Sequence, residues 1–508
     1  MVKRLMLFLG LGLMGVGAQV TSVEKAETTP VVVQDCPSVA EVEEALKKAA
    51  MFCRTNLSFA GGYATDWSRD LKESGTSDIM MSTVISIESP GTPSFGLAYL
   101  AGWKATGDPL YLQGMKEVVQ ALLWSQLASG GWDTFHDFAL PAARKWHYRR
   151  DLDAGDVERG GRKARSTLDD GKTQLALMFL LEVAQLAEFK EDGSLQKALR
   201  FGMEGLLAAQ APNGGWPQGY EGPADGSAPV VKARFPVEWS RVFPKVEYTS
   251  FYTLNDGNLE SLCRLLLRAH ELDAEGGEKY LAAAKRLGDF LLLAQCPQPQ
   301  PGWAQQYNLE MEPVWARKFE PPSVSSLETL GALKTLHQVW LATGEKKYLE
   351  PVKEALAWLE KSRLPDGQYA RFYELGSNKP LYFVKDTYEL TYEDGNLPTH
   401  YGFKLDELQD DIEQFKKLML RPREELLAKR VPKATEREWL SALKGLTKKA
   451  VTALKDKNKE GLWTEENRYD AGEIVANMMV MAKYVEAAKG AGSLFEEYRG
   501  KVNVSGGG

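Results

Sequence analysis

Apolar residues along much of the chain recur at the spacing of an α-helix. One series runs through Leu175, Leu177, Met178, Leu181, Val183 and Leu186, and another runs through Leu262, Leu265, Leu266 and Ala269. Residues three or four positions apart share one face of a helix, so each series predicts a helix with one buried side. Alternating patterns typical of strands are few and short. The pattern therefore predicts an all-α protein.

A helix followed by a loop rich in glycine occurs several times along the chain. The loops end in Trp132, Trp216 and Trp303 at nearly equal spacing, and each is preceded by a glutamine. Similarity at a fixed period indicates a repeated supersecondary unit. We expect an α/α toroid (an incomplete α/α barrel) of repeated helical hairpins, with short strands in the loops and the tryptophan loops on one face. Each tryptophan could contact a ligand or only cap a neighbouring helix.

The N-terminus has the pattern of a secretory signal peptide. Lys3 and Arg4 precede an apolar run from Leu5 to Val16, and small residues follow as far as Ala18. The run is short for a membrane-spanning helix, although an uncleaved anchor is the alternative. We expect export to a periplasm or out of the cell, with no membrane attachment after cleavage.

The rest of the chain divides by composition and pattern. The predicted segments are a signal peptide (1–18), a linker (19–35), the toroid (36–405), a charged helical connector (406–437), helices that complete the toroid (438–495) and a flexible tail (496–508). Met478, Met479 and Met481 fall in the last helical segment, where they are expected to fill the core.

The overall charge limits the class of partner. The 508 residues carry a formal net charge of −7, with ordinary hydrophobic (44%) and charged (26%) contents. This balance argues against nucleic acid as a partner. An acidic ligand would need local basic residues or a bridging cation at its binding site.

Several other kinds of site are disfavoured. The five histidines show no HExxH spacing, no GxSxG occurs, and no two cysteines form a CxxC. Four cysteines in an exported chain permit disulfides, and pairing of neighbours, Cys36 with Cys53 and Cys263 with Cys296, is expected. Buried free thiols are the alternative.

Carboxylates gather in two similar turns. Asp169-Asp170-Gly171 and Asn255-Asp256-Gly257 each precede a predicted helix. Aspartate is common as a helix cap, which is the purely structural interpretation. At matching points of a repeat, however, the two turns would bring oxygen ligands together at one rim, and such oxygens suit calcium.

Arg317 lies between Trp315 and Phe319, just before Pro321 and Pro322. Its planar fork of donors matches a carboxylate, and the aromatic neighbours suggest a binding surface for an acidic ligand. The structural alternative is a surface ion pair with Glu320.

Several segments around these residues resemble the family-ten pectate lyases. They are 213–218, 252–257, 303–322, 370–374 and 377–380, in the order of that family, over roughly residues 90 to 390. The resemblance implies an α/α toroid that depends on Ca²⁺. It also implies cleavage of α-1,4-linked polygalacturonate (pectate) by β-elimination, with release of 4,5-unsaturated oligogalacturonides.

The same resemblance implies roles for particular residues. Arg317 is expected to be the catalytic base or to stabilise the intermediate, and Asp169 and Asp256 are expected to serve calcium. The expected substrate-binding residues are Asp170, Trp216, Tyr252, Asn255, Trp303, Arg371 and Lys385. Lys385 stands where the family usually has arginine, which keeps the charge but loses the bidentate grip. The segment from Gly219 to Pro244 is longer than the family pattern and could reshape the substrate site.

Other interpretations remain open. The loops ending in Trp132 and Trp216 fit a Q-x-x-x-G-x-W pattern of triterpene cyclases, but the Asp-x-Asp-Asp acid of those enzymes is incomplete here. A toroidal glycoside hydrolase acting on acidic polysaccharide would use two carboxylates. A non-catalytic polysaccharide-binding relative of the lyases is the third alternative.

Overall fold

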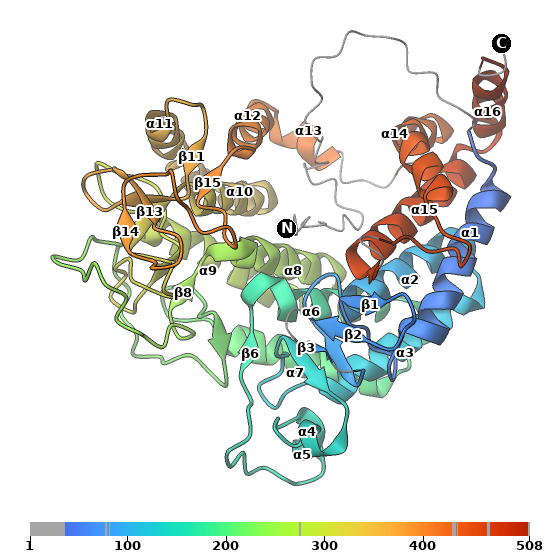
Figure 1. Ribbon diagram of the computed structural model, residues 1–508, viewed down its shortest axis with the longest axis horizontal. Coiled ribbons are helices and arrows are strands. Elements are labelled where there is room, and N and C mark those ends of the chain that lie inside the picture. Colours follow the sequence, from blue (N-terminus) through green and yellow to red (C-terminus); the bar gives the residue numbers. More distant parts are fainter. Residues whose placement is uncertain are drawn as a thin grey trace.

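Helices arranged in an open arc make up most of the molecule (Figure 1). The computed structural model describes residues 36–505 except 77–78, 81, 274–275, 429–432, 434 and 465–467. The predicted signal peptide (1–18) and linker (19–35) lie outside the described residues. Within the described part of the chain, no helix combines the length and the apolar character needed to cross a membrane.

The helices form two concentric rows. The inner row, in which each helix packs against the next, consists of α15 (Ala471–Ala491), α2 (Thr92–Thr106), α6 (Lys172–Val183), α8 (Asn258–Leu272) and α10 (Ser326–Thr343). The outer row consists of α1 (Val39–Phe52), α14 (Glu436–Lys455), α3 (Pro109–Ser125), α7 (Gly193–Ala208), α9 (Glu278–Ala294) and α11 (Val352–Ser362). Stacked helical hairpins around a curve confirm the predicted α/α toroid, which is not closed into a full barrel (Figure 1).

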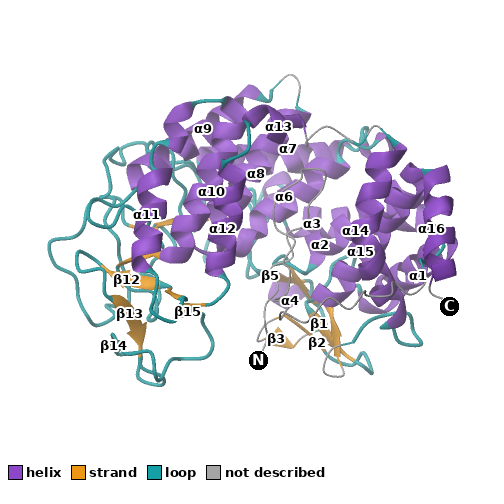
Figure 2. Cartoon of the chain, turned by 90° about the horizontal axis from the view of Figure 1, so that it is seen from above, coloured by secondary structure: helices purple, strands orange, loops and turns teal. Residues whose placement is uncertain are grey.

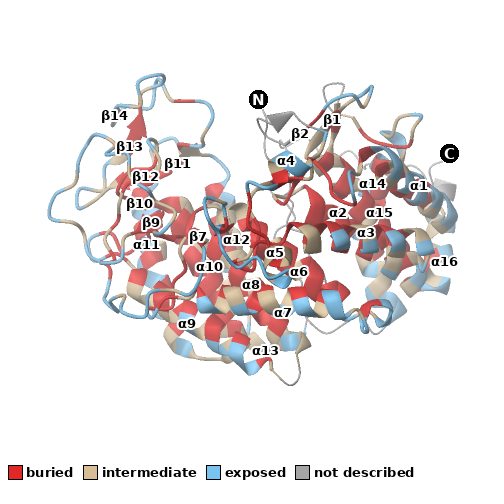
Figure 3. Ribbon diagram, turned by 90° about the horizontal axis from the view of Figure 1, so that it is seen from below, coloured by how far each residue is buried: buried red, intermediate tan, exposed pale blue. Residues whose placement is uncertain are grey.

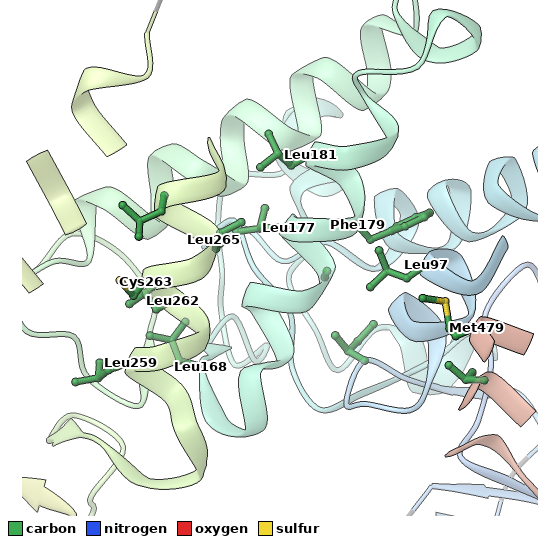
Figure 4. Close-up of a cluster of buried hydrophobic side chains, with 14 of the residues drawn as sticks. Leu97, Leu168, Leu177, Phe179, Leu181, Leu259, Leu262, Cys263, Leu265 and Met479 are labelled. Carbon is green, nitrogen blue, oxygen red and sulfur yellow. The ribbon is translucent and has the colours of Figure 1, made fainter. Parts of the chain in front are cut away.

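The core lies between and along the two rows. In α6, Phe179 points toward Leu97 of α2, and Leu177 points toward Leu265 of α8 (Figure 4). α2, α6 and α8 have an inner helix on both sides and an outer helix behind them, so most of their residues are buried. The outer helices α7 and α9 instead expose one face (Figure 3). Both predicted helical series are confirmed, although Leu186 lies beyond the end of α6.

A short strand precedes every helix of the inner row. These strands are β4 (Val84–Ser86), β6 (Ser166–Thr167), β8 (Tyr252–Thr253), β10 (Ser323–Ser325) and β16 (Arg468–Asp470). Their antiparallel partners are β5 (Phe135–Asp137), β7 (Gly219–Tyr220), β9 (Gln306–Tyr307), β12 (Phe372–Glu374) and β1 (Asp66–Ser68). The strands lie along one side of the arc (Figure 2), so the N-terminal ends of the inner helices form a common rim.

The remaining strands extend two of these pairs and add one more. β2 (Ser74–Thr76) and β3 (Ile79–Met80) continue the sheet of β16 and β1. β13 (Pro380–Phe383) and β14 (Leu390–Thr391) continue the sheet of β10 and β12. β11 (Tyr369–Ala370) pairs with β15 (Lys404–Leu405). Two short helices, α4 (Leu140–Ala143) and α5 (Arg149–Asp153), lie in the loop before β6.

The C-terminal region is largely helical. In the predicted connector, α12 (Leu408–Met419) buries Leu408, Ile412 and Phe415 and packs against α10, and α13 (Arg423–Ala428) follows. α14 and α15 pack together at the other end of the arc (Figure 1), where Met478, Met479 and Met481 are buried as expected. α16 (Ser493–Ser505) is helical over much of the predicted tail.

The cysteines do not form disulfides. Cys36, Cys53, Cys263 and Cys296 are all buried thiols outside any disulfide, so the expected pairing of neighbours is wrong. Cys36 instead contacts the hydroxyl of Tyr484 at 3.2 Å, and Cys296 contacts that of Tyr307 at 3.6 Å. Burial in apolar surroundings raises the pKa of the Cys53 thiol, which keeps this thiol neutral.

Candidate active site

Two turns with the same backbone shape begin the neighbouring helices α6 and α8. In the first, Asp170 has φ 51° and ψ 22°, and in the second, Asp256 has φ 53° and ψ 27°. This left-handed conformation is uncommon for residues other than glycine. The repeat therefore makes Asp170, and not Asp169, the structural counterpart of Asp256. Asp169 corresponds to Asn255.

Asp169 is held by neighbours from the protein itself. Its Oδ1 accepts a hydrogen bond from Gln218 Nε2 at 2.7 Å, and its Oδ2 lies 3.3 Å from Lys172 Nζ. Burial works to raise the pKa of Asp169, but Lys172, Gln218 and Arg317 outweigh it, so the net shift is downward. Asp169 is thus an ionised carboxylate with both oxygens engaged.

Asp256 has the opposite electrostatic character. Its Oδ2 accepts a hydrogen bond from Asn255 Nδ2 at 2.6 Å, while its Oδ1 lies 3.9 Å from Arg371 Nη2. Burial raises the pKa of Asp256 to about 7. Arg371 opposes this shift, and the charges of Asp170, Asp169 and Glu328 add to it. A carboxyl with so high a pKa, beside other acids, is typical of a functional site.

Arg371 is buried among acidic and aromatic groups. Its Nη2 donates to Glu328 Oε1 at 3.1 Å, and its guanidinium lies 4.3 Å from the ring centre of Tyr401. Burial works to lower the pKa of Arg371, but Tyr401, Glu328 and Asp256 outweigh it and the net shift is upward. Its Nε has no hydrogen-bond partner among the described residues although it is buried. That atom is a donor still available to a ligand.

Arg317 forms a bidentate ion pair with Glu320. Its Nε donates to Glu320 Oε2 at 2.8 Å, its Nη2 donates to Glu320 Oε1, and its backbone N–H also donates to Oε2 at 3.1 Å. The partner carboxylate is buried, while 32% of the Arg317 side chain is exposed. Burial works to lower the pKa of Arg317, but the ion pair raises it more, so the guanidinium stays charged.

Tyr401 connects the two arginines. Its hydroxyl donates to Glu320 Oε1 at 3.2 Å and lies 3.3 Å from Gln305 Oε1. The guanidinium of Arg317 lies 5.8 Å from the ring centre of Tyr401, and the guanidinium of Arg371 lies 4.3 Å from the same ring centre. Burial raises the pKa of Tyr401. The charge of Arg371 lowers this pKa and the surrounding carboxylates raise it, so the net shift is upward. The charged residues of the two turns and of the Arg317 segment therefore lie close enough to affect one another's pKa values.

The tryptophans expected to bind substrate lie inside the fold. Trp216 and Trp303 are 1% and 0% exposed, and their indole N–H groups donate to Leu206 O at 2.8 Å and Leu291 O at 2.9 Å. Trp132 and Trp463 make the same bond to the last turns of α3 and α14. Carbonyls in the last turn of a helix lack partners within the helix. This geometry favours the capping interpretation.

The two remaining predicted contacts differ in position. Tyr252 is buried in β8 with its ring against Phe290. Lys385 is exposed in the hairpin between β13 and β14. In the same hairpin, the ring of Tyr388 lies 3.8 Å from Lys318 Nζ, so the hairpin borders the Arg317 segment.

The long segment after Gly219 also reaches this region. The Nε1 of Trp315 donates to Ser240 O at 2.8 Å, and Phe243 packs against the Trp315 ring. Arg241 forms an ion pair with Glu374 and lies 5.2 Å from the ring centre of Trp239. The segment therefore covers the Trp315 side of the Arg317 loop.

Sequence reasoning missed four members of the site. Lys172 follows the Asp-Asp-Gly turn directly, and Glu320 was considered only as a surface partner. Glu328 lies in the first turn of α10, where an acid is unremarkable as a helix-dipole partner. Tyr401 has no local sequence signal, because only the fold places it beneath Arg317 and Arg371.

Acidic groups outnumber basic ones at the rim. Glu88, Asp169, Asp170, Asp256, Glu320 and Glu328 face Lys172, Arg317 and Arg371. Among the described residues, no cluster of three or more His, Cys, Asp or Glu side chains could by itself hold a metal ion. Asp256 would fit a calcium ion as part of a larger ligand set, because its Oδ1 lies 3.9 Å from Arg371 Nη2, beyond hydrogen-bond distance.

The fold and the rim together define an α/α toroid with paired acidic and basic side chains at the N-terminal ends of its inner helices. The family model of the pectic acid lyases matches residues 143–403, just over half of the chain. The protein therefore belongs to the pectic acid lyase family and is a polysaccharide lyase. The matched range contains both turns, Arg317, Arg371 and Tyr401.

Solved structures with similar folds have low sequence identity. A family 10 polysaccharide lyase from Cellvibrio cellulosa is 20% identical, with a TM-score of 0.42 over 59% of this chain and 90% of the other. An aspartate-to-alanine mutant of that lyase in complex with trigalacturonic acid is 19% identical, with a TM-score of 0.42 over 64% and 98%. Cellobiose 2-epimerase from Bacillus thermoamylovorans is 12% identical, with a TM-score of 0.43 over 88% and 100%. No curated protein sequence matches the chain significantly.

Proposed function

We propose that the protein is a pectate lyase that cleaves α-1,4-linked polygalacturonate by β-elimination. The observation that carries the proposal is the pairing of Arg317 with buried Glu320 beside the Asp169–Asp170 and Asp256 turns, all within the range matched by the pectic acid lyases. The products would be 4,5-unsaturated oligogalacturonides.

Arg317 is the proposed catalytic residue, and its ion pair bears on its role. In a galacturonate chain the C5 proton lies beside the uronate carboxylate, so its removal places negative charge on that group. A charged guanidinium can stabilise this charge. A base must be neutral to accept the proton, and Glu320 opposes neutral Arg317. The ion pair therefore supports charge stabilisation. Hydroxide would take the C5 proton and become water, a route favoured by alkaline pH. The C4–C5 double bond then forms as the C4–O4 bond breaks, and the departing O4 takes a proton from water, which regenerates hydroxide.

We propose calcium as the cofactor. Asp256 would contribute an oxygen, and the substrate carboxylate and water would supply the rest. When bound, the ion would supply positive charge next to the uronate. Around it, Arg371 would present its free Nε to a uronate oxygen, since its Nη2 is already bonded to Glu328.

The test is incubation of the purified protein with polygalacturonate, with and without calcium. Absorbance of the conjugated 4,5-unsaturated product should rise in calcium, stop on addition of a chelator and return with excess calcium. New reducing ends without the unsaturated product would indicate a glycoside hydrolase. Binding of the polymer without any product would indicate a non-catalytic relative. Turnover that ignores the chelator would exclude calcium while leaving the lyase.

We also propose that the protein is exported through the signal peptide at residues 1–18. The support is the charged start, apolar run and small residues before position 18. N-terminal sequencing of the protein recovered outside the cytoplasm should give a start near residue 19. Recovery with Met1 intact would contradict cleavage.

A further inference from the structure

A buried lysine directly follows the Asp169–Asp170 turn and pairs with its carboxylates. Lys172, the first residue of α6, places its Nζ 3.0 Å from Asp170 Oδ2, 3.3 Å from Asp169 Oδ2 and 3.6 Å from Glu88 Oε2. Its side chain is 2% exposed. Because a buried charge without a partner is very unfavourable, the ammonium and the carboxylates hold one another in place.

The second turn has the same backbone but no such cation. Gly171 and Gly257, which follow the two aspartates, have φ of 70° and 68°, and the next residues are Lys172 and Asn258. Asn258 is 1% exposed, and neither atom of its amide has a hydrogen-bond partner among the described residues. The two turns therefore differ by one full positive charge at matched positions.

This difference decides which turn can accept a metal ion. Calcium takes six to eight oxygen ligands, so it needs carboxylate oxygens that are free to turn toward it. Asp169 and Asp170 each direct an oxygen at Lys172, and the other Asp169 oxygen is bonded to Gln218. A second cation would also meet repulsion from the buried ammonium. Asp256, by contrast, has only the more distant Arg371 as a cation near its Oδ1, within the part of the chain that the structure describes.

We propose that Lys172 is a built-in counter-ion that prevents the Asp169–Asp170 turn from binding a divalent cation in the substrate-free protein. Calcium would then be held mainly from the Asp256 side, together with the uronate of the substrate. This last step rests on the proposed function, whereas the behaviour of the substrate-free protein does not. Lys172 is thus a positioning residue that acts through the carboxylates.

The proposal is tested by calcium titration calorimetry and thermal unfolding of Lys172→Met without substrate. Lys172→Met should gain one saturable calcium site, with a Kd on the order of 10⁻⁴ to 10⁻³ M, the range of weak extracellular sites. Binding should be at least tenfold tighter than in the wild type, and calcium should raise the Tm. Lys404→Met is the matched control, because Lys404 also bridges two aspartates, Asp366 and Asp394, at 2.5 Å each but away from the two turns.

Equal calcium binding by the wild type and Lys172→Met would overturn the proposal, and so would an equal gain in Lys404→Met. Lys172→Met leaves buried carboxylates without their cation, so Lys172→Gln, which keeps a hydrogen-bond donor there, is measured in parallel. If Lys172→Met does not fold, Lys172→Gln decides by the same tenfold criterion. An inactive wild type in the polygalacturonate assay would refute the lyase function without changing these binding results.

Discussion

Arg317 and Glu320 form an ion pair in which only the cation reaches solvent. Glu320 is 1% exposed, whereas 32% of the Arg317 side chain is exposed. The glutamate fixes one edge of the guanidinium and leaves the rest of it open to a ligand. An ordinary surface pair would expose both partners, so this arrangement differs from the structural alternative considered for the sequence.

Arg317→Lys should lower kcat by roughly 100-fold or more, because it moves the nitrogen and loses the planar fork. KM should change little, since Arg371 is still present. Steady-state kinetics on polygalacturonate measure both. Arg421→Lys is the matched control, because Arg421 pairs at 2.8 Å with a glutamate, Glu425, that is exposed and not buried. Near-normal kcat in Arg317→Lys would remove Arg317 from the catalytic residues.

Glu320→Gln should distinguish the two roles of Arg317. The change removes the charge that raises the pKa of Arg317 but keeps the size of the side chain. If Arg317 acts as a charged stabiliser, kcat falls by roughly tenfold or more, because charge-assisted hydrogen bonds that orient it are weakened. The pH of maximal activity then stays where it is. A shift of the activity profile to lower pH would instead support a neutral arginine as base.

Asp256→Asn should change how stability depends on pH. The pKa of Asp256 is raised from 3.8 to about 7 in the folded protein, so its contribution to stability is complete below pH 4. That contribution is lost as pH rises through 7, with a slope of up to about 1.4 kcal/mol per pH unit. Asparagine cannot ionise, so the decline is absent in the variant.

Urea unfolding from pH 4 to pH 8 in calcium-free buffer measures this difference. The wild type should lose stability relative to Asp256→Asn across that range. Parallel pH dependence of the two proteins would show that Asp256 has an ordinary pKa in the fold. A uniform drop in stability of the variant at every pH would favour a helix-capping role.

Lys385→Arg should lower KM for long polygalacturonate chains, and Lys385→Ala should raise it, with kcat unchanged in both. The reason is that the exposed hairpin bearing Lys385 borders the Arg317 segment, where arginine offers two donors to a uronate. Lys361→Ala, at an exposed position in α11, is the control. Unchanged KM in both Lys385 variants would place this residue outside the substrate path.

Local patterns determined the architecture of this protein. The helical spacing through Leu177 and Leu265 and the repeated glycine–tryptophan loops were enough to predict a toroid of hairpins, because these signals extend over only a few residues. The two Asp–Gly turns could be recognised in the same way, since each is set by adjacent residues. Arg317 and Arg371 were identified through the family resemblance.

Only the tertiary structure decided how these groups are used. The sequence could not show that Glu320 is buried, that the tryptophans cap outer helices, or that the cysteines form no disulfide. From the sequence we paired Asp169 with Asp256, whereas the backbone conformation of the two turns shows that Asp170 is the counterpart of Asp256. The physical reason is that burial and charge environment depend on groups far apart in the chain. The pKa of Asp256 is set by burial together with Arg371, Asp170 and Glu328, which the packing of α6, α8 and α10 brings to one rim.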